Sequence, residues 1–320
     1  MNRTAAFVFP GQGAQRPGMS AELLALHPEL AGRYHSVADA VLGLPLSQLC
    51  LRGPARDLDD PPIAQPAVFL TSLMTLEVLR SYGVEPRAVA GHSLGHYTAL
   101  TATGVLEWTE ALRLVRLRGE LMASVDDRVP GSTAAVLGLD RFRVQRLCAA
   151  ASAATARVVE VTGHYGPGGN VVSGEDAAVE HVTRAARRAG AARVLRLTPG
   201  GAFHSSLLRD IEEEYADALA TAEFHDPDRP LMSGATGQWL TSGAEAAATL
   251  RGELTRSVRW SDAVEALAAT GADRFVEVGP GCLLGGLIRR ALPAARVHST
   301  GSARQLASTI SSFAPAYAGA

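Results

Sequence analysis

The run Gly91-His92-Ser93-Leu94-Gly95 is a G-x-S-x-G pattern and has the clearest chemical potential in the chain. The apolar residues 87–91 predict a strand before the serine, and residues 93–104 predict a helix after it. A serine between a strand and a helix occupies a sharp turn, which exposes its hydroxyl beside the positive end of the helix dipole. This context favours a nucleophilic Ser93 over an incidental serine in a glycine-rich turn.

A serine nucleophile needs a neighbouring base that accepts its proton. Among the nine histidines, His204 is the best candidate, because it follows a predicted strand in a loop whose glycines permit a sharp approach to Ser93. His92 and His96 flank the serine with H-x-x-x-H spacing, but the zinc-protease motif needs glutamate where Ser93 stands. We therefore expect no metal site.

The composition argues against several other kinds of site. The chain has 320 residues and a net charge of −2, so we expect neither a nucleic-acid partner nor a membrane partner. The apolar N-terminal run 5–10 is too short for a signal or transmembrane segment, and the three cysteines form no CxxC pair. All thirty basic residues are arginine, so Schiff-base, pyridoxal-phosphate and P-loop lysine chemistry are excluded. We expect a reduced, cytoplasmic, monomeric protein with no bound cofactor.

The elements predicted around these residues belong to the α/β class. Short apolar strands alternate with helices over the ranges 5–9, 66–82, 87–91, 93–104, 108–123, 207–222 and 273–278, which indicates a parallel sheet covered on both faces. Residues 130–199 follow the order β-α-β-β-α-β, the ferredoxin-like split unit. We predict a large subdomain over 1–129 and 200–300, this small inserted subdomain, and a surface tail over 301–320.

Six motifs follow one another along the chain, over about residues 5–292. They are Phe9-Pro10-Gly11-Gln12-Gly13, Gln65-Pro66-Ala67, Gly91-His92-Ser93-Leu94-Gly95, Arg118-Gly119-Glu120-Leu121-Met122, Gly201-Ala202-Phe203-His204 and Glu277-Val278-Gly279-Pro280-Gly281. This ordered set resembles the malonyl-CoA:acyl carrier protein transacylase family, which includes acyltransferases of polyketide synthases. The resemblance implies a hydrolase-like parallel-sheet domain with a ferredoxin-like insert. It also implies transfer of malonyl from a coenzyme A thioester substrate to an acyl carrier protein, in fatty acid or polyketide biosynthesis.

The resemblance further implies a ping-pong reaction through an acyl-serine. Ser93 would attack the thioester with His204 as general base. The main-chain N–H groups of Gln12 and Leu94 would form the oxyanion hole, where each donor is worth about 3 kcal/mol. His92 would line the acyl site, and the acceptor would be the phosphopantetheine thiol of the carrier.

Three further positions concern the acyl group itself. Arg113 and Arg116 fit a solvated basic helix face, whereas the resemblance assigns Arg118 to the free carboxylate of the substrate, a role that suits a planar guanidinium. Met122 belongs to the same substrate-binding motif. Phe203 is similar to the phenylalanine that accompanies malonyl rather than methylmalonyl in relatives, a steric selection worth only about 1–3 kcal/mol.

Several positions depart from the family pattern. His96 stands where glutamate is usual, and Ser257 stands where proline is usual. Glu253 replaces a glutamine whose main-chain carbonyl orients the base histidine. Either the carbonyl of Glu253 has the same role, or its carboxylate turns inward and forms a Ser-His-Glu triad. The loop 163–170 replaces an asparagine-containing loop. These changes leave room for an unusual acyl group or a dedicated carrier.

Other functions remain as alternatives at this stage. A transferase could move an unusual acyl group between two carrier proteins, and the same site could belong to an editing thioester hydrolase or to a silent docking module. Arg118 argues against hydrolysis, and intact Ser93, His204 and Gln12 argue against a silent module. An acidic carrier would be met by exposed arginines, for which the candidates are Arg184, Arg187, Arg188, Arg289 and Arg290.

Overall fold

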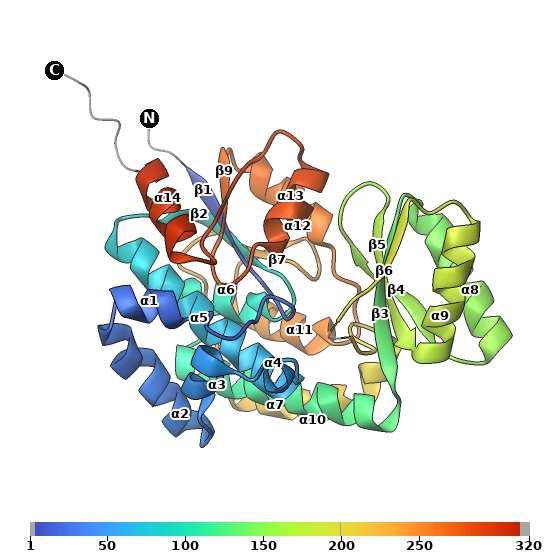
Figure 1. The fold of residues 1–320 in the computed structure, drawn as a ribbon, viewed down its shortest axis with the longest axis horizontal. Coiled ribbons are helices and arrows are strands. Elements are labelled where there is room, and N and C mark those ends of the chain that lie inside the picture. Colours follow the sequence, from blue (N-terminus) through green and yellow to red (C-terminus); the bar gives the residue numbers. More distant parts are fainter. Residues whose placement is uncertain (1–3, 199, 314–320) are drawn as a thin grey trace.

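The computed structural model describes residues 4–198 and 200–313, which form two sheets (Figure 1). The larger sheet has the order β10-β9-β1-β2-β7-β8 and is parallel except at the pair β7–β8. Its strands are β1 (Ala5–Phe9), β2 (Pro86–Gly91), β7 (Leu231–Ser233), β8 (Trp239–Leu240), β9 (Arg274–Glu277) and β10 (Arg296–Ser299). The predicted α/β class with a parallel sheet is confirmed.

The central strand β1 shows why this sheet carries helices on both faces. All five of its residues are buried, and alternate side chains of a strand point to opposite faces. Phe7 and Phe9 join one apolar cluster, while Ala6 and Val8 join another. A strand buried on both sides reads as a continuous apolar run, which is what residues 5–9 show.

Helices supply the remaining apolar surface of both clusters. In chain order they are α1 (Ala21–Leu26), the π-helix η1 (Ala31–His35), α2 (Ser36–Leu42), α3 (Leu46–Arg52), α4 (Ala55–Leu58), α5 (Pro61–Ser81), α6 (Gly95–Ala102), α7 (Trp108–Arg128), the 3₁₀ helix η2 (Ser206–Ile211), α10 (Glu212–Thr221), α11 (Gly243–Glu253), α12 (Trp260–Ala269), α13 (Leu283–Ala291) and α14 (Ala303–Phe313). α5 and α7 pack against each other in the first cluster, and α12 and α13 in the second.

The smaller sheet is antiparallel and has the order β4-β5-β3-β6. Its elements are β3 (Gly131–Leu137), α8 (Arg141–Thr155), β4 (Val159–His164), β5 (Gly169–Glu175), α9 (Asp176–Arg188) and β6 (Arg193–Arg196). The two helices pack together with this sheet around a separate apolar cluster. This is the predicted ferredoxin-like order, and in Figure 1 the unit extends from the larger subdomain as a lobe of its own.

Helix α5 differs from the sequence prediction at its start. The predicted helix began at residue 66, whereas α5 begins at Pro61, and Pro66 lies inside it. Pro61 and Pro62 are tolerated because they lie in the first helical turn, where N–H groups have no helical acceptor. Pro66 lies past this turn, so it removes one hydrogen bond of the helix. α5 is long and apolar enough to cross a membrane by length and composition alone, but 89% of its most apolar window is buried inside the fold. In this structure it is a core helix.

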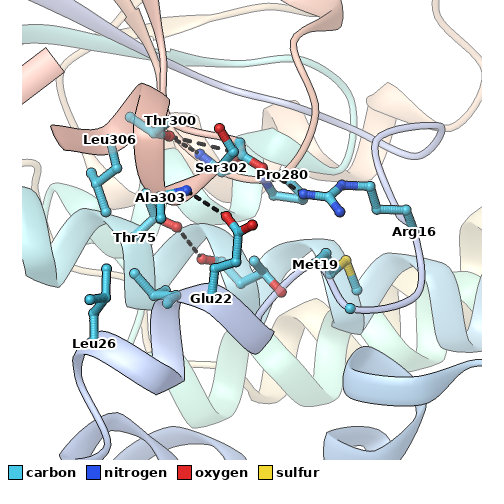
Figure 2. A pocket seen from close by; sticks show the side chains of 15 residues that line it. Arg16, Met19, Glu22, Leu26, Thr75, Pro280, Thr300, Ser302, Ala303 and Leu306 are labelled. Carbon is cyan, nitrogen blue, oxygen red and sulfur yellow. Dashed lines mark hydrogen bonds between the residues drawn. The ribbon is translucent and has the colours of Figure 1, made fainter. Parts of the chain in front are cut away.

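The segment predicted as a surface tail over 301–320 lies largely at the surface where the structure describes it, but it is helical and is packed on one side. Residues 303–313 form α14, which buries Leu306 and follows the unpredicted strand β10. Figure 2 shows how this segment joins the N-terminal region: the Arg16 guanidinium donates to the Gly301 carbonyl at 2.7 Å, and the Ala303 N–H donates to Glu22 at 2.7 Å. The space between these segments is only about 20 Å³, so the contact is packing rather than a ligand site. Residues 314–320 lie outside the described part.

Candidate active site

Ser93 lies on a turn between β2 and α6 that only small neighbours permit. A Cβ on Gly91 would lie 2.1 Å from the main chain of Gly95, and a Cβ on Gly95 would lie 2.1 Å from the Phe9 carbonyl oxygen. Ser93 itself has a φ of 50°, in the left-handed region that non-glycine residues rarely adopt. The predicted helix from residue 93 therefore begins two residues later, at Gly95, because Ser93 cannot be helical.

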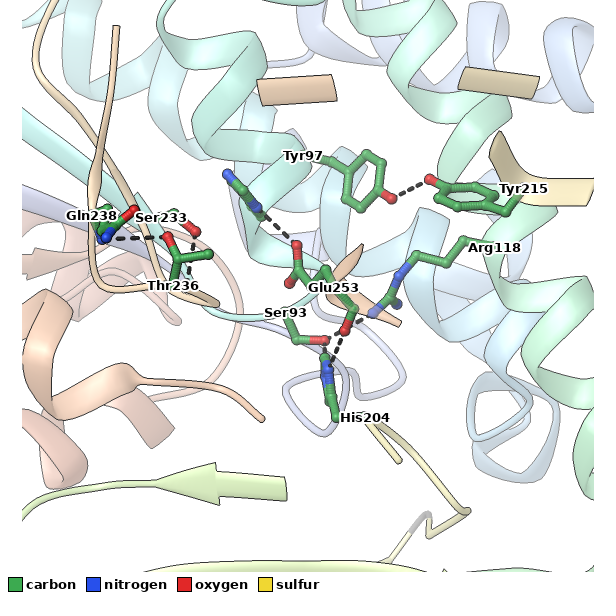
Figure 3. A network of polar contacts seen from close by, with 10 residues as sticks. Ser93, Tyr97, Arg118, His204, Tyr215, Ser233, Thr236, Gln238 and Glu253 are labelled. Atoms are coloured by element: carbon green, nitrogen blue, oxygen red, sulfur yellow. Dashed lines mark hydrogen bonds and ion pairs between the residues drawn. The ribbon is translucent and has the colours of Figure 1, made fainter. Parts of the chain in front are cut away.

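His204 is hydrogen-bonded to Ser93, with 2.8 Å between the serine Oγ and Nε2 (Figure 3). The other ring nitrogen, Nδ1, lies 2.8 Å from the main-chain carbonyl oxygen of Glu253. Since a carbonyl can only accept, Nδ1 carries the hydrogen, and Nε2 presents its lone pair to the serine hydroxyl. This is the tautomer that a general base requires. His204 also has a positive φ, 58°, so strain of the kind found at active sites is present at both members of the pair.

The electrostatic surroundings keep His204 neutral. Burial lowers its pKa below 6.5, and the Arg118 cation lowers it further, while the Glu253 carboxylate and carbonyl act in the opposite direction. A neutral imidazole at neutral pH can accept the serine proton. The geometry and the direction of the pKa shift therefore agree on the role of base.

Arg118 points into the same site from α7 and is 2% exposed. Its Nη2 donates to the Ser93 Oγ at 3.0 Å, and its Nη1 donates to the Gln65 side-chain oxygen at 2.6 Å. Within residues 4–198 and 200–313, no carboxylate lies within ion-pair distance of this guanidinium. A buried cation without a partner is costly, so this geometry suits an anionic group brought by a ligand.

Two main-chain donors lie beside Ser93. The Leu94 N–H follows the nucleophile directly, and Gln12 belongs to the loop packed on the turn, where a Cβ on Gly11 would lie 2.6 Å from the His92 carbonyl oxygen. In the described part of the chain, neither N–H donates a hydrogen bond to another protein group. Free, fixed donors next to a nucleophile are what an oxyanion hole requires.

A cavity of about 270 Å³ opens over Ser93 between the two subdomains. Its volume approaches the lower end of the range for ligand pockets, about 300–1,000 Å³. The lining residues are Gln12, Gly13, His92, Ser93, Arg118, Met122, Thr133, Thr162, Tyr165, Val171, Ser173, Leu197, Thr198, Phe203, His204 and Leu283. The nucleophile Ser93, the base His204 and the Arg118 guanidinium therefore meet in one cavity.

His92 lies on the cavity wall and contacts the small subdomain. Its Nε2 is 2.8 Å from the Tyr165 hydroxyl, and its ring meets Trp260 edge-on, with 5.2 Å between ring centroids. Burial lowers the pKa of His92 to about 4. His92 is therefore neutral over the range in which His204 works.

The loop that carries His204 is attached to the small sheet at both ends. The Thr133 hydroxyl on β3 donates to the Gly201 carbonyl oxygen at 2.7 Å. The Glu160 carboxylate on β4 accepts from both the N–H and the hydroxyl of Ser206, each at 2.8 Å. The base thus sits on a loop that is bonded to the small sheet at both ends and then continues into η2, which packs in the core of the large subdomain.

The comparisons with known proteins agree with this geometry. The profile of the family described as "Acyl transferase domain" matches residues 6–311. This chain belongs to the acyl transferase domain family.

Individual relatives of this acyl transferase cover nearly all of it. The malonyl CoA-acyl carrier protein transacylase of Escherichia coli O157:H7 is 36% identical over 286 residues, 89% of this chain and 92% of that protein. The crystal structure of malonyl-CoA:acyl carrier protein transacylase from Xanthomonas oryzae pv. oryzae has a TM-score of 0.92 at 33% identity, covering 98% of this chain and 99% of that one. A malonyl-transacylase solved in complex with a type II PKS acyl-carrier protein has a TM-score of 0.90 at 31% identity, covering 97% and 99%.

The structure of the acyl transferase brings the predicted site residues together. Met122 and Phe203 both line the cavity, and the Gln65 amide lies 3.4 Å from the Met122 sulfur. The sequence left two roles open for Glu253, and the structure shows which one applies. The main-chain carbonyl of Glu253 accepts a hydrogen bond from His204, whereas its carboxylate contacts His96 at 2.8 Å. The Ser-His-Glu triad is therefore not formed by the side chain.

Sequence reasoning missed several residues of the site. Gln65 was noted only as part of a motif, although it fixes Arg118 and also donates to the Gln12 side chain at 3.3 Å. Tyr165 was noted only as part of a divergent loop. The hydroxyls of Thr133, Thr162 and Ser173 had no sequence signal, because their proximity depends on strand register in the small sheet.

Proposed function

We propose that this acyl transferase moves malonyl from malonyl-CoA to the phosphopantetheine thiol of an acyl carrier protein through an acyl-serine. The observation that carries this proposal is the buried guanidinium of Arg118 beside Ser93, which has no carboxylate partner among the described residues. A short acyl group bound to Ser93 and bearing a terminal carboxylate would place that carboxylate against the guanidinium. The names of the relatives support the same donor and acceptor.

In the first half-reaction, the Ser93 hydroxyl gives its proton to Nε2 of His204 as Oγ attacks the thioester carbonyl carbon. The N–H groups of Leu94 and Gln12 donate to the oxyanion of the tetrahedral intermediate. Its collapse breaks the carbon–sulfur bond, and the departing thiolate takes the proton from Nε2. The products are free coenzyme A and malonyl-Ser93.

In the second half-reaction, the carrier thiol gives its proton to the same Nε2, and its sulfur attacks the acyl-serine ester. Collapse breaks the bond between the acyl carbon and Oγ, and Ser93 recovers its proton from His204. Arg118 keeps the carboxylate in place through both steps. The acyl group therefore stays fixed while the thiol that enters and the thiol that leaves are exchanged.

Intact-protein mass spectrometry tests this function directly. After brief exposure to malonyl-CoA, the wild-type protein should carry one malonyl adduct, which acetyl-CoA does not produce to a comparable extent. The chain has no lysine, so side-chain amines cannot contribute to the signal. Ser93→Ala should abolish labelling, and labelling of that variant would contradict the mechanism.

Delivery to the carrier is measured in the same experiment. Addition of a phosphopantetheinylated carrier protein should discharge the adduct and move the malonyl mass to the carrier. Loss of the adduct to free malonate, with no gain on the carrier, would instead show an editing hydrolase. An adduct formed only from an acylated carrier would show carrier-to-carrier transfer.

A further inference from the structure

His96 and Glu253 form a buried contact that the mechanism above does not use. His96 Nδ1 lies 2.8 Å from a carboxylate oxygen of Glu253, and the two side chains are 0% and 2% exposed. His96 lies in the first turn of α6, three residues after the nucleophile, and Glu253 is the last residue of α11. Both residues depart from the family pattern, and the structure brings the two departures into contact.

The hydrogen bond itself indicates how the protons are arranged. A carboxylate has only acceptors, so the Nδ1 atom of His96 donates. Within the described residues, Nε2 of His96 and the second carboxylate oxygen have no hydrogen-bond partner. A proton on Nε2 would therefore have no protein acceptor. The single hydrogen bond from Nδ1 therefore holds the Glu253 carboxylate in one orientation inside the protein.

The pKa of Glu253 supports the ionised form. Burial acts to raise that pKa, but His96 and the nearby Arg118 and His204 lower it, and the net shift is downward. The titratable and charged groups that face this carboxylate come from α6, α7, α10, the nucleophile turn and the base loop. They are His96, Tyr97, Arg118, Tyr215, His92 and His204. Figure 3 shows Glu253 beside Arg118 and His204, with the hydrogen-bonded pair Tyr97 and Tyr215 nearby.

Glu253 acts on His204 in two separate ways. Because it ends α11, its main-chain carbonyl has no N–H one turn further along the helix, and it accepts from His204 Nδ1 at 2.8 Å instead. The negative end of the α11 dipole lies at the same point and favours a positive imidazole. The carboxylate of the same residue raises the pKa of His204, opposite to the effect of Arg118. The hydrogen bond from His96 to the Glu253 side chain therefore fixes the position of the Glu253 carbonyl and of its negative charge.

We propose that the His96–Glu253 pair is a positioning unit for the base. It anchors the carbonyl that orients His204, and it supplies a buried negative charge that stabilises the imidazolium formed when Ser93 gives up its proton. This role rests on the proposed acyl transfer. The pair does not line the cavity, so it acts through His204 and not through contact with the acyl group.

The decisive variant is Glu253→Gln, which keeps the main-chain carbonyl and an acceptor for His96 but removes the charge. We expect its acylation rate with malonyl-CoA to fall about tenfold, because the imidazolium loses the stabilisation that the carboxylate supplies. The acid limb of the pH–rate profile should move to lower pH, because the carboxylate no longer raises the pKa of His204. The concentration of malonyl-CoA at half-maximal rate should stay within about twofold, since the pair does not touch the ligand.

Two further variants separate a charge effect from disturbed packing. His96→Gln retains an N–H donor toward the carboxylate, so it should keep the acid limb in place and most of the rate. Glu277→Gln is the matched control, because Glu277 is also a fully buried carboxylate, but it accepts from the N–H groups of Leu284 and Gly285 instead of facing His204. Its acid limb and its rate per folded molecule should equal those of the wild type.

Stopped-flow acylation of Ser93 between pH 5 and 8 measures all four proteins. The proposal is supported if the acid limb of the pH–rate profile moves in Glu253→Gln and in no other variant. It is overturned if Glu253→Gln has the acid limb and the rate of the wild type. It is also overturned if all three variants are slowed equally and their acid limbs do not move. If the wild-type protein itself forms no adduct from malonyl-CoA, the proposed function fails instead, so the two failures are distinguishable.

Discussion

The two walls of the cavity differ in the kind of side chain that they present. The wall from the large subdomain carries Ser93, Arg118 and Gln12, and the Leu94 N–H follows the serine; within the described residues, the N–H groups of Gln12 and Leu94 donate to no protein group. The wall from the small sheet presents the hydroxyls of Thr133, Thr162 and Ser173, the Tyr165 phenol and apolar side chains, and it presents no charged side chain among the described lining residues. The nucleophile and the cation are thus on one side and neutral groups on the other, while the base His204 comes from the loop that is bonded to the small sheet.

Under the proposed function, this difference fits a cavity that takes the same thiol arm from two partners. The charged wall would hold the acyl group, which is the same in both half-reactions. The uncharged wall would border the phosphopantetheine arm, which coenzyme A and the carrier protein share. A wall of hydroxyls offers both donors and acceptors without imposing a charge on that arm. Substitutions on the two walls should therefore differ in size and in kind.

The largest effect should follow from Arg118→Ala, on the charged wall. Malonyl transfer should fall about a hundredfold or more, since breaking a buried ion pair costs about 3 kcal/mol or more. Acetyl transfer should fall much less, so the ratio of the two rates should shift toward acetyl. Rates with both coenzyme A thioesters measure this. Arg113→Ala, an exposed arginine on the same helix, is the matched control, and an unchanged ratio in Arg118→Ala would break the comparison.

A smaller effect is expected from Tyr165→Phe, on the uncharged wall. This change keeps the ring but removes the hydroxyl that lies 2.8 Å from His92 Nε2. We expect acylation to slow by about two- to tenfold, because one buried polar atom loses its partner. The malonyl-to-acetyl ratio should not change. A change in that ratio would mean that both walls select the acyl group.

The smallest effect should be that of mild acidification on the wild-type protein. The pKa of His204 is lowered, and a base works only while it is unprotonated, so the acid limb must lie below the ordinary histidine value of 6.5. The acylation rate at pH 6.5 should therefore be more than about half of its plateau at higher pH. Rates measured across the range check this. A midpoint above 6.5 would show that Arg118 and burial do not dominate the surroundings of the base.

Much of this site could be predicted because its constraints are local. Ser93 stands between two glycines that only close main-chain packing explains, and the strand and helix on either side have clear apolar patterns. The order of elements in the small sheet was also readable, since each strand and helix there is short and well separated. His204 could be chosen because it follows a strand in a glycine-rich loop.

The rest depends on contacts between residues far apart in the chain. No pattern in the sequence shows that His96 meets Glu253, because they are 157 positions apart and lie on different helices. The same holds for Gln65 with Arg118. The helix α14 was not predicted, because its alanines and serines suggest a polar segment without regular structure, whereas Leu306 and Thr309 lie on one buried face of a helix that is otherwise at the surface.

The attachment of the base loop to the small sheet has a mechanical consequence. His204 spans the boundary: its loop is bound to β3 and β4 at Gly201 and Ser206, while its ring is bound to Ser93 and to the end of α11. Any widening of the cleft must break one set of these contacts. The 2.8 Å between Oγ and Nε2 therefore depends on how the two subdomains sit against each other, so the catalytic pair is itself one of the contacts that join them.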